Sequence, residues 1–101
     1  MLIVAMIGLG AVLLPAAPAS AHAALTTATP EPGSVVATAP GEITLTFTEG
    51  ITPVPDRTQV LAPDGKRITG AVAAIGSTLR IQVRRADQPL GTYLVSYRIV
   101  S

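Results

Sequence analysis

The sequence has no cysteine and no tryptophan, one histidine, and as its other aromatic residues two tyrosines and one phenylalanine. Without cysteine there can be no thiol nucleophile, no iron–sulfur cluster and no zinc-finger motif. Exported domains of this size often rely on disulfides, because a small chain buries a smaller share of its surface. This chain must instead be stabilised by strand pairing, by packing or by a metal ion.

Charge is also scarce, with seven Lys or Arg and six Asp or Glu residues and a formal net charge of +1. Such a balance provides no basic surface for nucleic acid, so that class of partner is excluded. No charged side chain precedes Glu31, and every Lys and Arg lies between Arg57 and Arg98. The high hydrophobic fraction therefore reflects the N-terminal segment as well as a core.

The N-terminal segment has the pattern of a secretory signal peptide. Residues 2–14 are all apolar or glycine, and Ala19-Ser20-Ala21 is the small-x-small pattern that signal peptidase accepts. The alternative, a membrane anchor, needs about 20 apolar residues without helix breakers, and Pro15 and Pro18 interrupt this run. We predict a signal peptide over residues 1–21 and an exported protein at the periplasmic or extracytoplasmic face of the cell envelope.

Residues 22–101 read as short strands separated by turn residues, without helical periodicity. In residues 42–48, Ile43, Leu45 and Phe47 alternate with threonines, which is typical of a half-buried strand. Further extended segments are expected at residues 24–29, 57–61, 67–69, 71–75, 78–84 and 92–100. Residues 49–55, with two prolines, are expected to break the chain between strands. Strands at this spacing predict an all-β, antiparallel sandwich.

Two local motifs support a Greek-key sandwich. Pro63-Asp64-Gly65-Lys66 has the residues of a tight hairpin turn. Leu90-Gly91-Thr92-Tyr93 resembles a tyrosine corner, in which the phenol bonds back to the backbone, so we expect a structural role for Tyr93. The chain stops at Ser101 directly after an apolar strand, which would leave a sheet edge unpaired. We therefore expect that a closing strand is absent.

His22 falls at the predicted cleavage point and is the one residue with clear metal chemistry. On an N-terminal histidine the free α-amine and imidazole Nδ1 can close a chelate ring on one metal ion, and two nitrogens in a plane suit Cu(II). The amine has a reference pKa of roughly 8, so binding displaces a proton and weakens as pH falls. Since signal peptidase tolerates many residues after the cut, a histidine present by chance is the alternative.

Several short motifs, in this order and spacing, resemble CopC-type copper resistance proteins. They are His22-Ala23, Thr29–Ser34, Ala39-Pro40, Leu45–Glu49, Ala62–Gly65 and Leu90–Ser101. The resemblance implies an immunoglobulin-like β-sandwich that binds one Cu(II) through the N-terminal His, an Asp and a second His. In the family the last two form an Asp-x-His motif just after the strand that ends here at Ser101, so this chain shows one of the three principal ligands.

Glu49 is a weaker candidate ligand. It matches a glutamate that some CopC-type proteins bring near the metal; the alternative is a solvated acid at a strand end. Some relatives also carry a methionine-rich Cu(I) site, but Met1 and Met6 lie in the predicted signal peptide. Without thioether ligands in the mature chain, we expect a Cu(II)-only carrier.

The resemblance implies a binding protein and not an enzyme. Such a carrier buffers copper or delivers it to a CopD-type membrane transporter, which is sometimes fused to it. One alternative is a copper monooxygenase of the histidine-brace type, which requires a second histidine and usually exposed aromatic residues. The other is a metal-free, immunoglobulin-like adhesion module.

Overall fold

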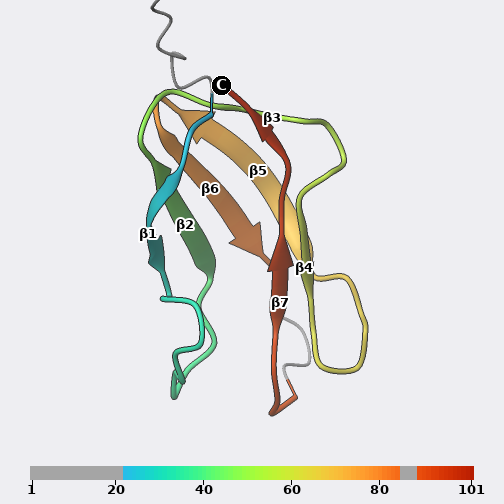
Figure 1. The fold of residues 1–101 in the computed structure, drawn as a ribbon. Coiled ribbons are helices and arrows are strands. Elements are labelled where there is room, and N and C mark those ends of the chain that lie inside the picture. Colours follow the sequence, from blue (N-terminus) through green and yellow to red (C-terminus); the bar gives the residue numbers. More distant parts are fainter. Residues whose placement is uncertain (1–21, 85–88) are drawn as a thin grey trace, which may run out of the picture.

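The computed structural model describes residues 22–84 and 89–101, and the predicted signal peptide lies outside these residues. The described part is all-β and antiparallel, without a helix, as expected (Figure 1). Its strands are β1 (Leu25–Thr29), β2 (Glu42–Phe47), β3 (Thr52–Pro53), β4 (Gln59–Leu61), β5 (Thr69–Ile75), β6 (Thr78–Val83), β7 (Leu94–Ser96) and β8 (Ile99–Val100).

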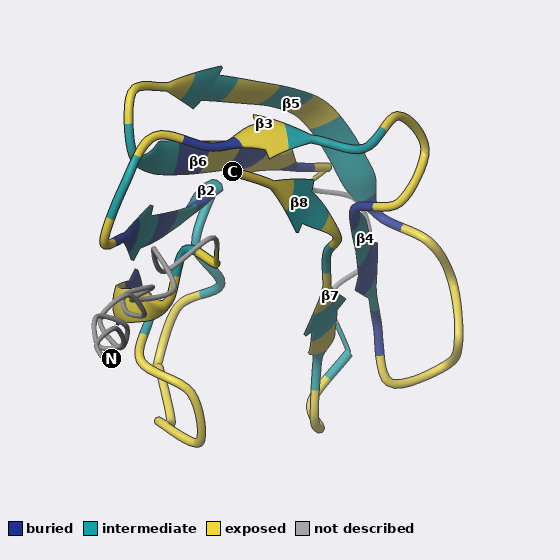
Figure 2. Ribbon diagram, turned by 45° about the horizontal axis from the view of Figure 1, so that its top comes forward, coloured by how far each residue is buried: buried dark blue, intermediate teal, exposed yellow. Residues whose placement is uncertain are grey.

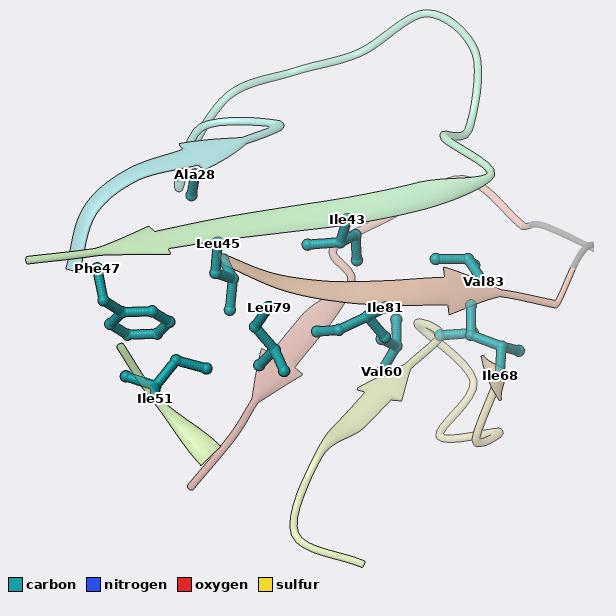
Figure 3. Close-up of a cluster of buried hydrophobic side chains, with 11 residues drawn as sticks. Ala28, Ile43, Leu45, Phe47, Ile51, Val60, Ile68, Leu79, Ile81 and Val83 are labelled. Carbon is teal, nitrogen blue, oxygen red and sulfur yellow. The ribbon is translucent and has the colours of Figure 1, made fainter. Parts of the chain in front are cut away.

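The strands form two layers of a β-sandwich. One layer is a four-stranded sheet in the order β1-β2-β6-β5. Across from it lie two shorter ladders, β3 with β8 and β4 with β7 (Figure 2). The core fills the gap between the layers: Val60 of β4 projects toward Ile81 of β6 (Figure 3).

The period-two alternation in β2 and β6 is confirmed. Ile43, Leu45 and Phe47 of β2 are buried, while the threonines between them are more exposed. In β6, Leu79 and Ile81 have no exposed surface, and the intervening Arg80 and Gln82 face solvent. β2 and β6 are the two central strands of this sheet, and their apolar face packs in the core between the layers.

The predicted hairpin turn at residues 63–66 is also confirmed. The Ala62 N–H donates to Lys66 O, and the Gly65 N–H donates to Ala62 O, both at 2.8 Å. Gly65 has a φ of 86°, a conformation that favours glycine. The Lys66 N–H also donates to Asp64 Oδ1 at 3.0 Å, the side-chain contact that makes aspartate common in such turns.

The prediction of one continuous strand at residues 92–100 is wrong in one respect. The segment forms two strands, because β7 pairs with β4 and β8 pairs with β3. Between them the Arg98 carbonyl accepts a hydrogen bond from Val54 N at 2.9 Å. The side-chain alternation nevertheless runs through the whole segment and leaves Tyr93, Val95, Tyr97 and Ile99 half-buried.

The expected break at residues 49–55 contains a strand, β3, and this corrects the prediction. Pro53 pairs with Ile99 although it has no N–H to donate. Proline is tolerated there because β3 is a two-residue strand with a partner on one side only among the described residues. The composition of this segment indicated a break, but pairing with the distant strand β8 makes part of it a strand.

The tyrosine corner is confirmed. The Tyr93 hydroxyl donates to the Pro89 carbonyl oxygen at 2.7 Å, four residues upstream. The bond fixes the chain where it enters β7. Tyr93 therefore has a structural role, as its sequence context predicts.

Candidate metal centre

The segment that carries His22 is attached to the end of β2. The Ala24 N–H donates to Thr48 Oγ1 at 2.9 Å, and the Thr48 N–H donates to Ala24 O, also at 2.9 Å. This reciprocal pair extends the ladder between β1 and β2 toward residue 22. The backbone beside His22 is thus held in place by two hydrogen bonds.

The same segment also contacts the end of β8. The Ala23 N–H donates to Ser101 Oγ at 3.1 Å, a bond between residues 78 positions apart. Figure 1 shows the segment that leads into β1 and the C-terminal end of the chain side by side at one end of the sandwich. His22 itself is exposed, so its imidazole is accessible to a metal ion.

Glu49, the second candidate, lies at this same end. It follows directly on Thr48, which binds Ala24, and its side chain is half-buried. The structure therefore brings the two candidate residues to adjacent segments. Within residues 22–84 and 89–101, however, no group of three or more His, Asp or Glu side chains is placed to hold a metal ion. His22 and Glu49 remain the two candidate ligands among the described residues.

A ring contact and a backbone hydrogen bond stabilise the part of the core next to this end of the sandwich. The Phe47 and Tyr97 rings pack edge to face, with centroids 5.6 Å apart and planes at 71°. This contact joins β2 to the segment between β7 and β8. The Phe47 N–H also donates to Ser77 O at 2.8 Å, which ties β2 to the turn before β6. The candidate residues are thus supported by both layers.

Sequence reasoning missed the residues that position His22. Thr48 and Ser101 bind its neighbours through hydroxyl groups, and neither residue carries a recognisable metal-site signal. Ser101 is separated from Ala23 by almost the whole domain. Only the antiparallel return of β8 beside β3 brings it there.

The aromatic residues all have structural roles. Phe47 is buried in the core, Tyr97 packs against it, and Tyr93 forms the corner with Pro89.

A family model described as a CopC domain matches residues 25–101. The chain belongs to the CopC family. CopC proteins bind and carry copper in copper resistance and are not enzymes. They are generally periplasmic or extracytoplasmic. Membership confirms the resemblance and a copper-related function at the level of the family.

Two other comparisons gave no result. No curated protein and no solved structure matches this CopC-family chain significantly. Among the described residues there is also no helix with the length and apolar character needed to cross a membrane.

Proposed function

We propose that this CopC-family chain is an exported carrier that binds one Cu(II) ion and buffers it or passes it to a CopD-type membrane protein. Family membership supports the copper chemistry. The observation that carries the assignment to His22 is the hydrogen bond from the Ala23 N–H to Ser101 Oγ. It holds the predicted new N-terminus where two layers of the sandwich meet.

In this proposal, removal of residues 1–21 frees the α-amine of His22. The amine and Nδ1 then bind Cu(II) in one plane, which matches the tetragonal preference of the ion. Because the bonds at Ala23 and Ala24 already hold the neighbouring backbone, less conformational freedom is lost when the metal binds. The site is therefore pre-organised on the protein side.

Glu49 is proposed as a further, weaker oxygen ligand from the adjacent segment. The family resemblance implies that further ligands come from an Asp-x-His motif, which residues 22–101 do not contain. These residues would complete the coordination sphere. The proposal thus assigns His22 the principal role among residues 22–101.

The test compares two forms of the protein that both begin at His22: one with a free α-amine, and one whose α-amine is acetylated. Acetylation converts the His22 amine into an amide and adds no new amine. We expect the acetylated form to bind Cu(II) at least roughly tenfold more weakly, a loss of about 1.4 kcal/mol, in a calorimetric titration. Electron paramagnetic resonance should also show fewer nitrogen ligands.

Two controls accompany this titration. Glu49→Gln should weaken binding less than acetylation of the amine does, and Glu31→Gln, an exposed carboxylate in the turn that follows β1, should not change it. Equal Cu(II) affinity of the two N-terminal forms would overturn the proposal that the His22 amine and imidazole chelate the ion. Absence of Cu(II) binding in both forms would overturn the carrier function, and mass spectrometry of the secreted product checks whether it begins at His22.

A further inference from the structure

A second region of the molecule has features that copper binding does not use. A hollow of about 640 Å³ lies between the loop that joins β3 to β4 and the beginning of β5. The loop passes beside β5 in both views (Figures 1 and 2). Among its lining residues are Asp56, Thr58, Arg67, Gly70 and Arg84. We call this region the Thr58 hollow; its volume is in the range of small-molecule sites.

Two arginines face this hollow without a counter-ion. The Arg84 N–H donates to Ile68 O at 2.8 Å, so Arg84 lies beside the segment that carries Arg67. Both side chains are exposed, and neither forms an ion pair with any described residue. With Asp56 on the lining, the hollow carries a net charge of +1. It therefore attracts an anion.

The wall of the hollow contains an unpaired hydroxyl. Thr58 is only 4% exposed, and its Oγ1 has no hydrogen-bond partner among the described residues. A buried hydroxyl without a partner is destabilising and is uncommon in native proteins. Because Thr58 belongs to the lining, a ligand in the hollow could supply the missing partner after a rotation about χ1.

The backbone around the hollow is irregular in two places. Asp56 has a φ of 62°, which is uncommon for a residue other than glycine. The register of β5 against β6 shifts between Thr69 and Val72, next to Gly70. Such bulges re-aim side chains and are over-represented near binding sites. Both irregularities lie on the lining of the same hollow.

We propose that the Thr58 hollow binds a small oxyanion, a carboxylate or a phosphate, independently of copper. Arg67 and Arg84 bind its oxygens through charge-assisted hydrogen bonds, for which guanidinium groups are well suited. Thr58 Oγ1 donates a further bond. The Asp56 carboxylate limits the positive charge of the lining.

The test is a nuclear magnetic resonance titration of the copper-free protein that begins at His22. Sodium acetate and sodium phosphate are added separately at constant ionic strength, with sodium chloride as the reference. We expect saturable shifts of the amides of Thr58, Arg67, Gly70 and Arg84 with at least one of the two oxyanions. Saturable shifts with acetate alone would identify a site for carboxylates, and saturable shifts with phosphate alone a site for tetrahedral oxyanions. Shifts equal to those with chloride would mean an adventitious ion only, and would overturn the proposal.

Charge variants distinguish a site from general attraction. Arg67→Gln and Arg84→Gln should each weaken oxyanion binding at least roughly tenfold. Lys66→Gln is the matched control, because it removes the same charge next to Arg67 from an exposed residue that does not line the hollow. Equal weakening by Lys66→Gln would show diffuse attraction and overturn the assignment.

The last variant, Thr58→Val, keeps the size of the side chain and removes the hydroxyl. The ligand-free variant should unfold at the same or a higher temperature, since an unpaired buried group has been removed. Its oxyanion affinity should fall severalfold. A variant that binds the oxyanion as well as the parent would overturn the role of Thr58 in the site. Because no copper is present, these results do not depend on the carrier proposal.

Discussion

Strand β6 and the β7–β8 segment, which lie in opposite layers of the sandwich, carry the same sequence pattern but bury it to different depths. In the four-stranded sheet, Leu79 and Ile81 of β6 have no exposed surface. In the facing layer, Val95 and Ile99 alternate just as regularly and are only partly buried. β6 has hydrogen-bonded neighbours on both sides, while β7 and β8 have a partner on one side within the described residues. The comparison of these two segments shows that alternation sets which face is apolar, while the packing around each segment sets how deeply that face is buried.

The largest expected effect comes from truncating matched isoleucines in the two layers. Ile81→Ala should lower the free energy of unfolding by about 3–4 kcal/mol, because it leaves a cavity in the fully enclosed core. Ile99→Ala should cost roughly 1–2 kcal/mol, since its side chain is already partly hydrated. Urea unfolding of both variants measures the difference.

If Ile81→Ala does not fold, the milder pair Ile81→Val and Ile99→Val gives the same comparison. We expect about 1 kcal/mol for the first and about half of that for the second. Equal losses in the two layers would show that the β7–β8 segment is packed as tightly as β6. The contrast between the layers would then be wrong.

A smaller effect is expected from crowding the four-stranded sheet where β5 approaches β6. A Cβ on Gly70 would lie 2.9 Å from Gln82 O and 3.0 Å from Gln82 Cβ. Gly70→Ala should therefore destabilise the protein by about 1–3 kcal/mol. Gly50→Ala is the matched control outside the strands, because its nearest neighbour, Gly76 O, would be 3.7 Å away. We expect the control to change the free energy of unfolding by less than about 0.5 kcal/mol, and a similar loss in both variants would contradict the close approach.

The smallest effect should come from the facing layer, at the tyrosine corner. Tyr93→Phe removes the bond to Pro89 O and should cost about 1 kcal/mol, seen as a decrease in Tm of roughly 4–8 °C. Tyr97→Phe is the comparison, since its hydroxyl has no hydrogen bond to the described residues and its ring contact with Phe47 remains. A Tm decrease as large for Tyr97→Phe would mean that the corner bond is not the cause.

The candidate copper site was partly predictable from the sequence. His22 is the one histidine and follows a cleavage pattern, so its chemistry is visible without a structure. Glu49 was expected from family resemblance. The hydroxyls of Thr48 and Ser101, which hold the neighbours of His22, were not expected, because a hydrogen bond over 78 positions leaves no trace in local sequence.

The Thr58 hollow was not predictable from the sequence. Thr58, Arg67 and Arg84 lie on three separate segments, and each is an ordinary residue in its own context. The sequence does show that all basic residues lie in the second half of the chain. It does not show that two of them meet beside a buried hydroxyl.

The sequence by itself determined the all-β class, the apolar faces of β2 and β6, the hairpin turn at residues 63–66 and the corner at Tyr93. These features follow from contacts between residues close in the chain, so period-two patterns and turn residues encode them directly. The tertiary structure alone decided that residues 92–100 divide between two partner strands, that Pro53 joins a ladder, and that Ala23, next to His22, contacts Ser101. These depend on the register of distant strands, which is fixed when the two layers pack against each other.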